Sequence, residues 1–188
     1  ILRIDNEGIE NVDLQDLEIA DSLGYKIKLL GLTELKNKNI KNFVYPCLLS
    51  TDSFIAKIDG VYNGIVVESN FCKKSCFVGE GAGAHPTATS VLSDIISLST
   101  KRKDDFKKKS KFHYEETSLQ SRFGSYYLRF TTYDKPGVIS GIANQFKTFN
   151  ISMKSMLQKE IEVGNSNDAT IVITTHNCLE KNMMRALK

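Results

Sequence analysis

The sequence predicts an α+β protein in two parts, each made of strands and helices around its own apolar residues. Two observations support this prediction. Runs of alternating apolar residues are interspersed with runs of helical spacing, and a lysine-rich stretch over 101–123 separates two such sets. We therefore expect a mixed sheet with helices over 1–100. Over 124–188 the elements follow the order βαββα, without a closing strand.

The first hundred residues are expected to form a helix, four strands and a second helix. Asp13 is a candidate N-cap with Asp16 three residues on, so a helix is expected over 14–22. Alternating apolar residues predict strands over 25–35, 42–50, 60–69 and 74–81, and the short polar break between the last two favours an antiparallel hairpin. Helical spacing of apolar residues predicts a helix from Pro86 to about Ser99.

The stretch 101–123 contains "TKRKDDFKKKSKF" and few aliphatic residues, so it is expected to be a polar linker at a domain boundary. After it, a strand is expected over 125–134. Two further strands are expected over 150–160 and 168–176, joined by the turn 164–168. The helical stripe between the first two strands consists of Val138, Ile142, Ala143, Phe146 and Phe149, and a last helix is expected to open at Asn177 with Glu180.

Composition excludes several classes of protein. The net charge of +3 comes largely from the lysine-rich stretch, so no basic face indicates a nucleic-acid partner. No apolar run approaches the ~20 residues of a membrane span and no signal-peptide pattern opens the chain, so we expect a cytoplasmic protein without a membrane partner. The four cysteines, Cys47, Cys72, Cys76 and Cys178, lack C-x-x-C spacing, and no metal site is expected.

The stretch "FVGEGAGAHPTATSVLSDI" raises the question of what its glycines serve. Gly79-x-Gly81-x-x-Ala84 matches the fingerprint of a phosphate-binding turn, which requires an acidic residue roughly 20 positions on at the end of a parallel strand. Asp104 and Asp105 lie at about that distance but within the lysine-rich stretch, so this match is interpreted as accidental. Two interpretations stay open: a turn that needs positive φ, or close approach of the backbone by a ligand.

The segment "GEGAGAHPTATSVLSDI" resembles "GPGAGGxPTASAVxxDI" of homoserine dehydrogenases. The resemblance continues upstream in "EGIENVDLQDLEIADSLGYKIKLLG" and "FIAKIDGVYNGIVVES", and covers about the first hundred residues. It implies that Gly83, with Gly81, lies against the nicotinamide end of NAD or NADP. It also implies a homo-oligomer, a dimer or tetramer, that reduces L-aspartate 4-semialdehyde to L-homoserine in threonine, methionine and isoleucine biosynthesis. Glu80 replaces the family's proline.

The segment "LRFTTYDKPGVISGIANQFKTFNISMKSMLQ" looks like an ACT domain, a ferredoxin-like module that senses amino acids. The resemblance implies an effector, expected to be threonine, bound where two copies of the module meet. The implied effector residues are Asp134, Gly137, Val138, Asn150 and Ile151. The "DKPGV" and "NIS" segments are expected to lie side by side. Taken without the resemblance, "DKPG" is simply a turn and Asn150 a helix stop.

The family's Rossmann domain, essential lysine and substrate-binding acidic residues are expected to belong to a segment before Ile1. Lys26 and Lys28 alternate along a strand and are interpreted as its polar face, and the three histidines, His85, His113 and His176, lie in separate segments. We therefore assign no catalytic residue and expect the chain alone to be inactive. Two hypotheses remain: the C-terminal part of a homoserine dehydrogenase, or a freestanding amino-acid-binding regulator with an ACT domain.

Overall fold

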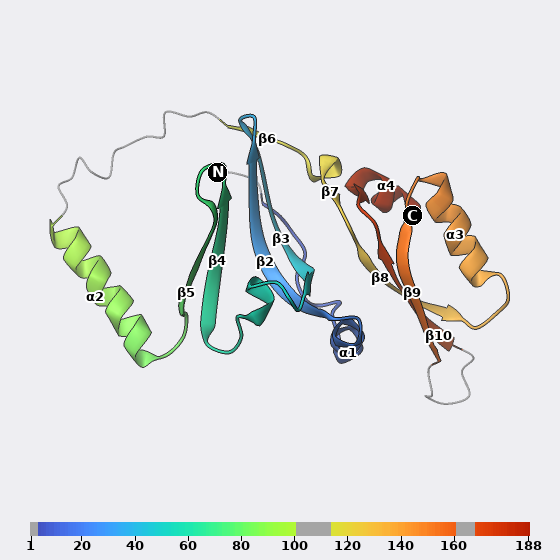
Figure 1. Ribbon diagram of the computed structural model, residues 1–188, viewed down its shortest axis with the longest axis horizontal. Coiled ribbons are helices and arrows are strands. Elements are labelled where there is room, and N and C mark those ends of the chain that lie inside the picture. Colours follow the sequence, from blue (N-terminus) through green and yellow to red (C-terminus); the bar gives the residue numbers. More distant parts are fainter. Residues whose placement is uncertain (1–3, 101–113, 161–167) are drawn as a thin grey trace. The chain divides into compact units, whose positions relative to one another are not determined.

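The structure is a computed structural model that describes residues 4–100, 114–160 and 168–188 (Figure 1). Most of the expected linker, 101–113, and nearly all of the expected turn at 164–168 lie outside these residues. The chain divides into two compact units. The N-terminal unit comprises Asn6–Leu32 and Asn42–Tyr114, and the C-terminal unit comprises Ile1–Asp5, Thr33–Lys41 and Glu115–Lys188. The α+β class is confirmed, with antiparallel strand pairs beside a parallel one.

The N-terminal unit begins with helix α1 (Leu14–Ser22), whose start is capped as the sequence predicts. The amide of Asp16 donates to the Asp13 carboxylate and the amide of Asp13 donates to the Asp16 carboxylate, each at 3.1 Å. This reciprocal pair satisfies two amides that the helix itself leaves unbonded. Ile19 and Ala20 on α1 are fully buried, so the cap holds the helix where its apolar face packs.

Two strand pairs follow α1. Strands β2 (Tyr25–Lys36) and β3 (Asn39–Ser50) form a long hairpin, with the short β1 (Asp5–Asn6) on the outer side of β3. After the short helix η1 (Ile55–Lys57), strands β4 (Tyr62–Ser69) and β5 (Lys73–Glu80) pair antiparallel, which confirms the predicted hairpin.

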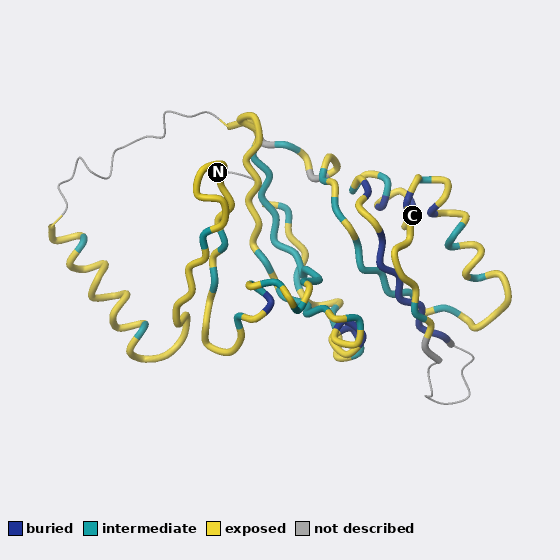
Figure 2. Tube along the Cα trace, viewed as in Figure 1, coloured by how far each residue is buried: buried dark blue, intermediate teal, exposed yellow. Residues whose placement is uncertain are grey.

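Helix α2 (Ala84–Thr100) ends the N-terminal unit and begins two residues before the predicted start. Pro86 is therefore the third helical residue, a first-turn position where its missing amide costs no helical hydrogen bond. No residue of α2 is buried, and Figure 2 shows the helix exposed along almost its whole length. No described residue therefore covers its predicted apolar stripe, which includes Val91, Leu92, Ile95 and Ile96.

The C-terminal unit has the predicted order of strand, helix, strand, strand, helix. These elements are β8 (Tyr127–Tyr133), α3 (Val138–Thr148), β9 (Met153–Glu160), β10 (Asp168–Thr175) and α4 (Glu180–Ala186). The three strands form an antiparallel sheet in the order β8-β10-β9. Its core is formed by Phe146, Ile151, Ile171, Ile173, Cys178, Met183 and Ala186.

The start of α4 differs from the prediction. Asn177 does not cap this helix; Leu179 occupies the N-cap position and makes no side-chain hydrogen bond there. The reason lies in the neighbouring chain, because Cys178 and Leu179 form the short strand β11, which pairs with β7 (Phe123–Gly124). Backbone pairing with a distant segment therefore delays the helix by two residues.

Short elements also occupy the described end of the expected linker. Strand β6 (Glu115–Glu116) pairs parallel with Asn39 and Ile40 of β3, and η3 (Leu119–Ser121) follows it. The amide of Glu115 donates to the Lys38 carbonyl at 2.9 Å and the amide of Thr117 to the Ile40 carbonyl at 3.1 Å. These bonds attach this segment to the tip of the β2–β3 hairpin.

Phe146→Ala is expected to lower the free energy of unfolding by about 3–5 kcal/mol, because the ring is only 2% exposed and its removal leaves a cavity. Ile139→Ala on the same helix is the matched control, since Ile139 is exposed and the expected loss is below about 1 kcal/mol. Urea unfolding of the chain, followed by circular dichroism, measures both. Equal losses for the two variants would contradict this core.

Candidate functional site

The glycine-rich turn, Gly79–Gly83, comprises the end of β5 and the connection to α2, and its three glycines have different surroundings. Gly83 has φ +118°, a backbone conformation that side chains with a Cβ rarely adopt. The carbonyl of Gly83 accepts hydrogen bonds from the Thr87 amide at 3.2 Å and the Thr87 hydroxyl at 2.7 Å. Gly83 is thereby held at the N-terminus of α2, where a glycine is required by the backbone itself.

Gly79 and Gly81 adopt ordinary backbone angles but differ in the space around them. A Cβ added at Gly79 would meet nothing within 4 Å. One added at Gly81 would lie 2.5 Å from Cγ of Asn63, which is closer than real Cβ contacts. The turn therefore presents open backbone at Gly79, while at Gly81 the absent side chain is replaced by that of Asn63.

An open hollow of about 460 Å³ lies beside the same hairpin. Its lining includes Lys28 and Leu30 of β2, Ile58 and Asp59 of the η1–β4 connection, and Asn63 of β4. Asn63 thus contributes both to this hollow and to the glycine-rich turn. The sequence gives no local signal for this arrangement, because the residues come from three separate segments.

Lys26 and Lys28 point to one carboxylate. Lys26 Nζ lies 2.8 Å from Asp59 Oδ2 and Lys28 Nζ lies 2.6 Å from Asp59 Oδ1, and Lys28 Nζ also donates to the Ile58 carbonyl. Hydrogen bonds from Lys26 and Lys28 lower the pKa of Asp59 to about 2. The polar face expected for this strand is therefore a charge cluster with one positive charge in excess.

The Asp59 carboxyl is expected to titrate at about pH 2, below its ordinary value of about 3.9. Because the folded pKa is lowered, stabilisation by this cluster is present above the unfolded pKa and is lost as the pH falls through about 2. The Lys26→Met/Lys28→Met variant should bring the Asp59 pKa back towards 3.9. Carboxyl-detected NMR titration measures the Asp59 pKa in the wild type and in the double variant. An unchanged midpoint in the double variant would contradict the pairing of Asp59 with the two lysines.

The expected effector residues lie at the two ends of α3. Gly137 is the N-cap of α3 with φ +97°, and a Cβ there would meet nothing within 4 Å. Asn150, with φ +55°, follows the other end, and the amide of the buried Ile151 donates to the Phe146 carbonyl at 2.9 Å. At 1.5 Å per residue, the 11 residues of α3 span about 16 Å. The expectation that "DKPGV" and "NIS" lie side by side in one chain is therefore wrong.

Asp134 and Val138 are already engaged within the C-terminal unit. Asp134 Oδ1 accepts a hydrogen bond from Gln158 Nε2 of β9 at 3.2 Å. Val138 packs against the hydrophobic core. The loop before α3 is exposed from Asp134 to Gly137, and a side chain added at Gly137 would meet nothing within 4 Å.

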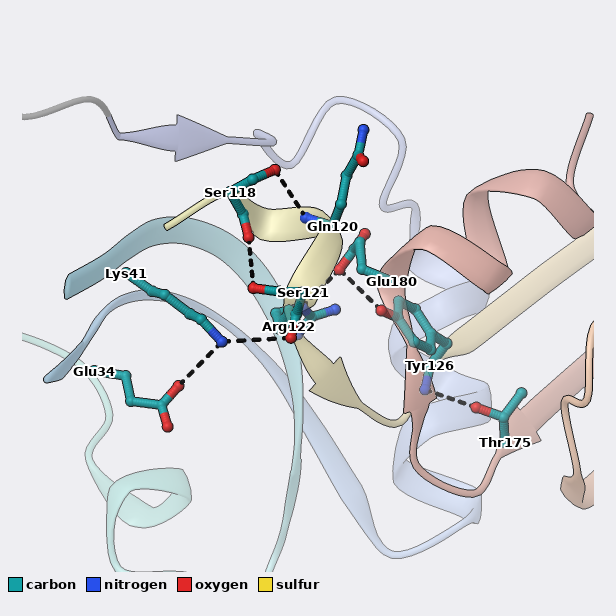
Figure 3. A network of polar contacts seen from close by, with 9 residues as sticks. All are labelled: Glu34, Lys41, Ser118, Gln120, Ser121, Arg122, Tyr126, Thr175 and Glu180. Atoms are coloured by element: carbon teal, nitrogen blue, oxygen red, sulfur yellow. Dashed lines mark hydrogen bonds and ion pairs between the residues drawn. The ribbon is translucent and has the colours of Figure 1, made fainter. Parts of the chain in front are cut away.

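A polar network in the C-terminal unit has no counterpart in the sequence prediction (Figure 3). Arg122 Nε lies 2.6 Å from Glu180 Oε2, and the Tyr126 hydroxyl donates to the same oxygen at 2.8 Å. The side chain of Glu180 is only 13% exposed and that of Arg122 23%, so loss of one partner would leave a poorly hydrated charge. Burial, followed by the hydrogen bond to Glu180, raises the pKa of Tyr126.

The network continues to the β2–β3 hairpin tip. Lys41 Nζ donates to the Ser121 carbonyl at 3.4 Å and lies 4.0 Å from Glu34 Oε2 (Figure 3). Arg122 is the next residue along the chain, and its carbonyl accepts from the Glu180 amide at 2.9 Å. The end of the expected linker is thereby bonded to both the hairpin tip and α4.

The remaining candidate residues do not gather into a further site. His85 lies on α2 and His176 follows β10, while His113 lies outside the described residues. Within 4–100, 114–160 and 168–188, no group of three or more His, Cys, Asp or Glu side chains could hold a metal ion. In the same ranges, no helix is both long and apolar enough to cross a membrane.

Comparison with known proteins identifies the family. Residues 1–96 match the family model of homoserine dehydrogenase. The chain is 36% identical to homoserine dehydrogenase of Helicobacter pylori over 97% of its length, and 33% identical to that of Neisseria gonorrhoeae over 96%. It spans 43% of each of these relatives.

A solved structure extends the likeness through both units. The crystal structure of a homoserine dehydrogenase from Thiobacillus denitrificans superposes with a TM-score of 0.80 at 28% identity, over 98% of this chain and 43% of that one. The matched proteins are dehydrogenases, a class of oxidoreductases. The chain belongs to the homoserine dehydrogenase family.

Proposed function

We propose that this chain is the C-terminal part of an enzyme that reduces L-aspartate 4-semialdehyde to L-homoserine with NAD or NADP, in the cytoplasmic biosynthesis of threonine, methionine and isoleucine. The family match supports this proposal, as does the strand-to-helix turn at Gly83. The role of this chain in the enzyme is to bind and orient the nicotinamide end of the cofactor. Hydride and proton transfer are assigned to none of the described residues, so the chain alone is expected not to oxidise homoserine.

The glycine-rich turn suits a flat ring that must approach the backbone closely. Gly83 has no side chain, its φ of +118° favours glycine, and the position of a Cβ at Gly79 is open. We infer that the turn from Gly81 to Gly83 holds the nicotinamide end, with Gly83 nearest to it. When bound, the nicotinamide ring donates or accepts the hydride, and the turn limits where that ring can lie. The observation that carries the proposal is the left-handed glycine at the start of α2.

Gly83→Ala in the full-length enzyme is expected to lower kcat/KM for the dinucleotide at least about tenfold, because a Cβ would intrude and the turn would be strained. Gly24→Ala is the matched control. Gly24 also has positive φ, +77°, and its Cβ position is open, so the substitution adds backbone strain away from the turn. Steady-state kinetics with varied dinucleotide measure both variants. Equal losses would assign the effect to backbone strain alone.

We propose further that the sheet β8-β10-β9 with α3 and α4 is an ACT module that binds an amino-acid effector. Its βαββα order and antiparallel sheet support this proposal. Because Gly137 and Asn150 lie at opposite ends of α3, a site containing both needs the loop of one copy and the strand start of another. We therefore propose a homo-oligomer, a dimer or tetramer, in which Asp134, Gly137 and Val138 face Asn150 and Ile151 of a second copy.

Threonine is the proposed effector, and its carboxylate suits the backbone amides at the start of α3. Gly137→Leu in the full-length enzyme should abolish inhibition by threonine and the heat of its binding, because a side chain there would fill the uncovered part of the loop. Gly141→Ala, one turn further along α3, is the control and should keep both. Calorimetry and inhibition assays test this. Equal inhibition of both variants would leave the module as an oligomerisation element.

A second candidate is a freestanding amino-acid-binding regulator. The separate hydrophobic core of the C-terminal unit favours it, because such a module can bind an effector without an attached catalytic site. Activity separates the two candidates. Homoserine oxidation that depends on a dinucleotide in the full-length protein supports the enzyme, and threonine binding without such oxidation supports the regulator.

A further inference from the structure

Asn63 belongs to β4, the neighbour of β5, and its side chain lies over the glycine-rich turn. Asn63 of β4 pairs with Gly79 of β5, and the Gly81 amide donates to the Val61 carbonyl at 2.8 Å. Side chains alternate between the two faces of a hairpin, so 61, 63, 79 and 81 share one face. Asn63 is therefore the diagonal neighbour of Gly81 on this face.

The Asn63 side chain lies close to only one of the two glycines on this face. A Cβ at Gly79 would meet nothing within 4 Å, whereas one at Gly81 would meet the Asn63 side chain at 2.5 Å from Cγ and 3.0 Å from Oδ1. The Asn63 side chain thus lies over Gly81 and leaves Gly79 open. This contact explains why position 81 is glycine although its backbone angles are ordinary.

Gly81 is held on two sides, by the Val61 carbonyl in the ladder and by Asn63 above it. Two residues later Gly83 takes its positive φ and α2 begins. A displacement at Gly81 is carried to Gly83 because only Ala82 lies between them. The side-chain amide of Asn63 makes no hydrogen bond with any described residue, so it contacts the turn through van der Waals packing alone.

We propose that Asn63 is a positioning residue for the dinucleotide: its side chain sets the place of the Gly81–Gly83 turn, and Gly81 is small in order to admit Asn63. The inference rests on the proposed function for the identity of the ligand. It separates the two glycines, since Gly83 limits the cofactor directly and Gly81 acts through Asn63. Asn63 also lines the hollow beside Lys28 and Asp59, so its replacement alters that wall as well.

The test is a double-mutant cycle in the full-length enzyme with Asn63→Ala, Gly81→Ala and both together. Each single variant is expected to raise the Kd and KM for NADPH about fivefold or more, with the KM for aspartate semialdehyde changed less than about twofold. In the Asn63→Ala background, adding Gly81→Ala should have little further effect, because the clash has been removed. Val67→Ala is the matched control on the same face of β4 and should change neither constant.

Several outcomes would overturn the inference. If the fold-changes of the single variants multiply in the double variant, Gly81 is small for a reason other than Asn63. If Asn63→Ala binds NADPH like the wild type, Asn63 does not position the turn. If the KM for aspartate semialdehyde rises as much as the KM for NADPH, the substitution disturbs the whole active site and not the cofactor turn in particular. Failure of the proposed function is recognised separately, because the wild-type enzyme would then bind neither NADH nor NADPH and would not turn over with either.

Discussion

The conformation of Gly83 is the constraint on which the candidate site depends. A strand must end and a helix must begin within three residues, and the chain achieves this with φ +118° at one position. Thr87 bonds twice to the Gly83 carbonyl and so attaches the first turn of α2 to it. Asn63 fills the space above Gly81. The backbone angle of Gly83, the start of α2 and the packing of Asn63 therefore together fix the positions of the backbone atoms from Gly81 to Gly83.

The two units are stabilised in different ways. The C-terminal unit has a continuous core from α3, α4 and the sheet, supplemented by the low-exposure pair of Arg122 and Glu180. In the N-terminal unit, few of the described residues are buried, and apolar side chains of β4, β5 and α2 such as Ile65, Phe77 and Ile95 are more than half exposed. A site on this unit is consequently built from turns and hairpins, where hydrogen bonds and glycine geometry fix atomic positions.

Local features were predictable from the sequence. The Asp13–Asp16 capping box, the β4–β5 hairpin and the stripe of α3 follow from patterns within about a dozen residues, and all three are confirmed. The start of α4 was not predictable, because pairing of β11 with β7 prevents Asn177 from capping it. The separation of the effector segments follows from the length of α3, which the stripe from Val138 to Phe149 already implies.

The missed site residues share one property, which is that their partners are distant in sequence. Asp59 meets Lys26 and Lys28 from about thirty residues away, and Glu180 meets Arg122 from 58 residues away. Asn63 stands in a segment that resembles the family, yet only strand register places it over Gly81. Such contacts depend on the fold rather than on local spacing. The resemblance therefore located the turn but not the residues that support it.

Hydrogen–deuterium exchange of the full-length protein, with and without NADPH, tests the central claim most directly. If the glycine-rich turn binds the nicotinamide end, amides from Gly79 to Thr87 should exchange more slowly with NADPH, since ordering of the turn reduces local opening. The segment Lys73–Ser75 at the far end of β5 should change little and serves as the internal reference. Saturating NADPH that slows exchange elsewhere but leaves Gly79–Thr87 unchanged would contradict the account.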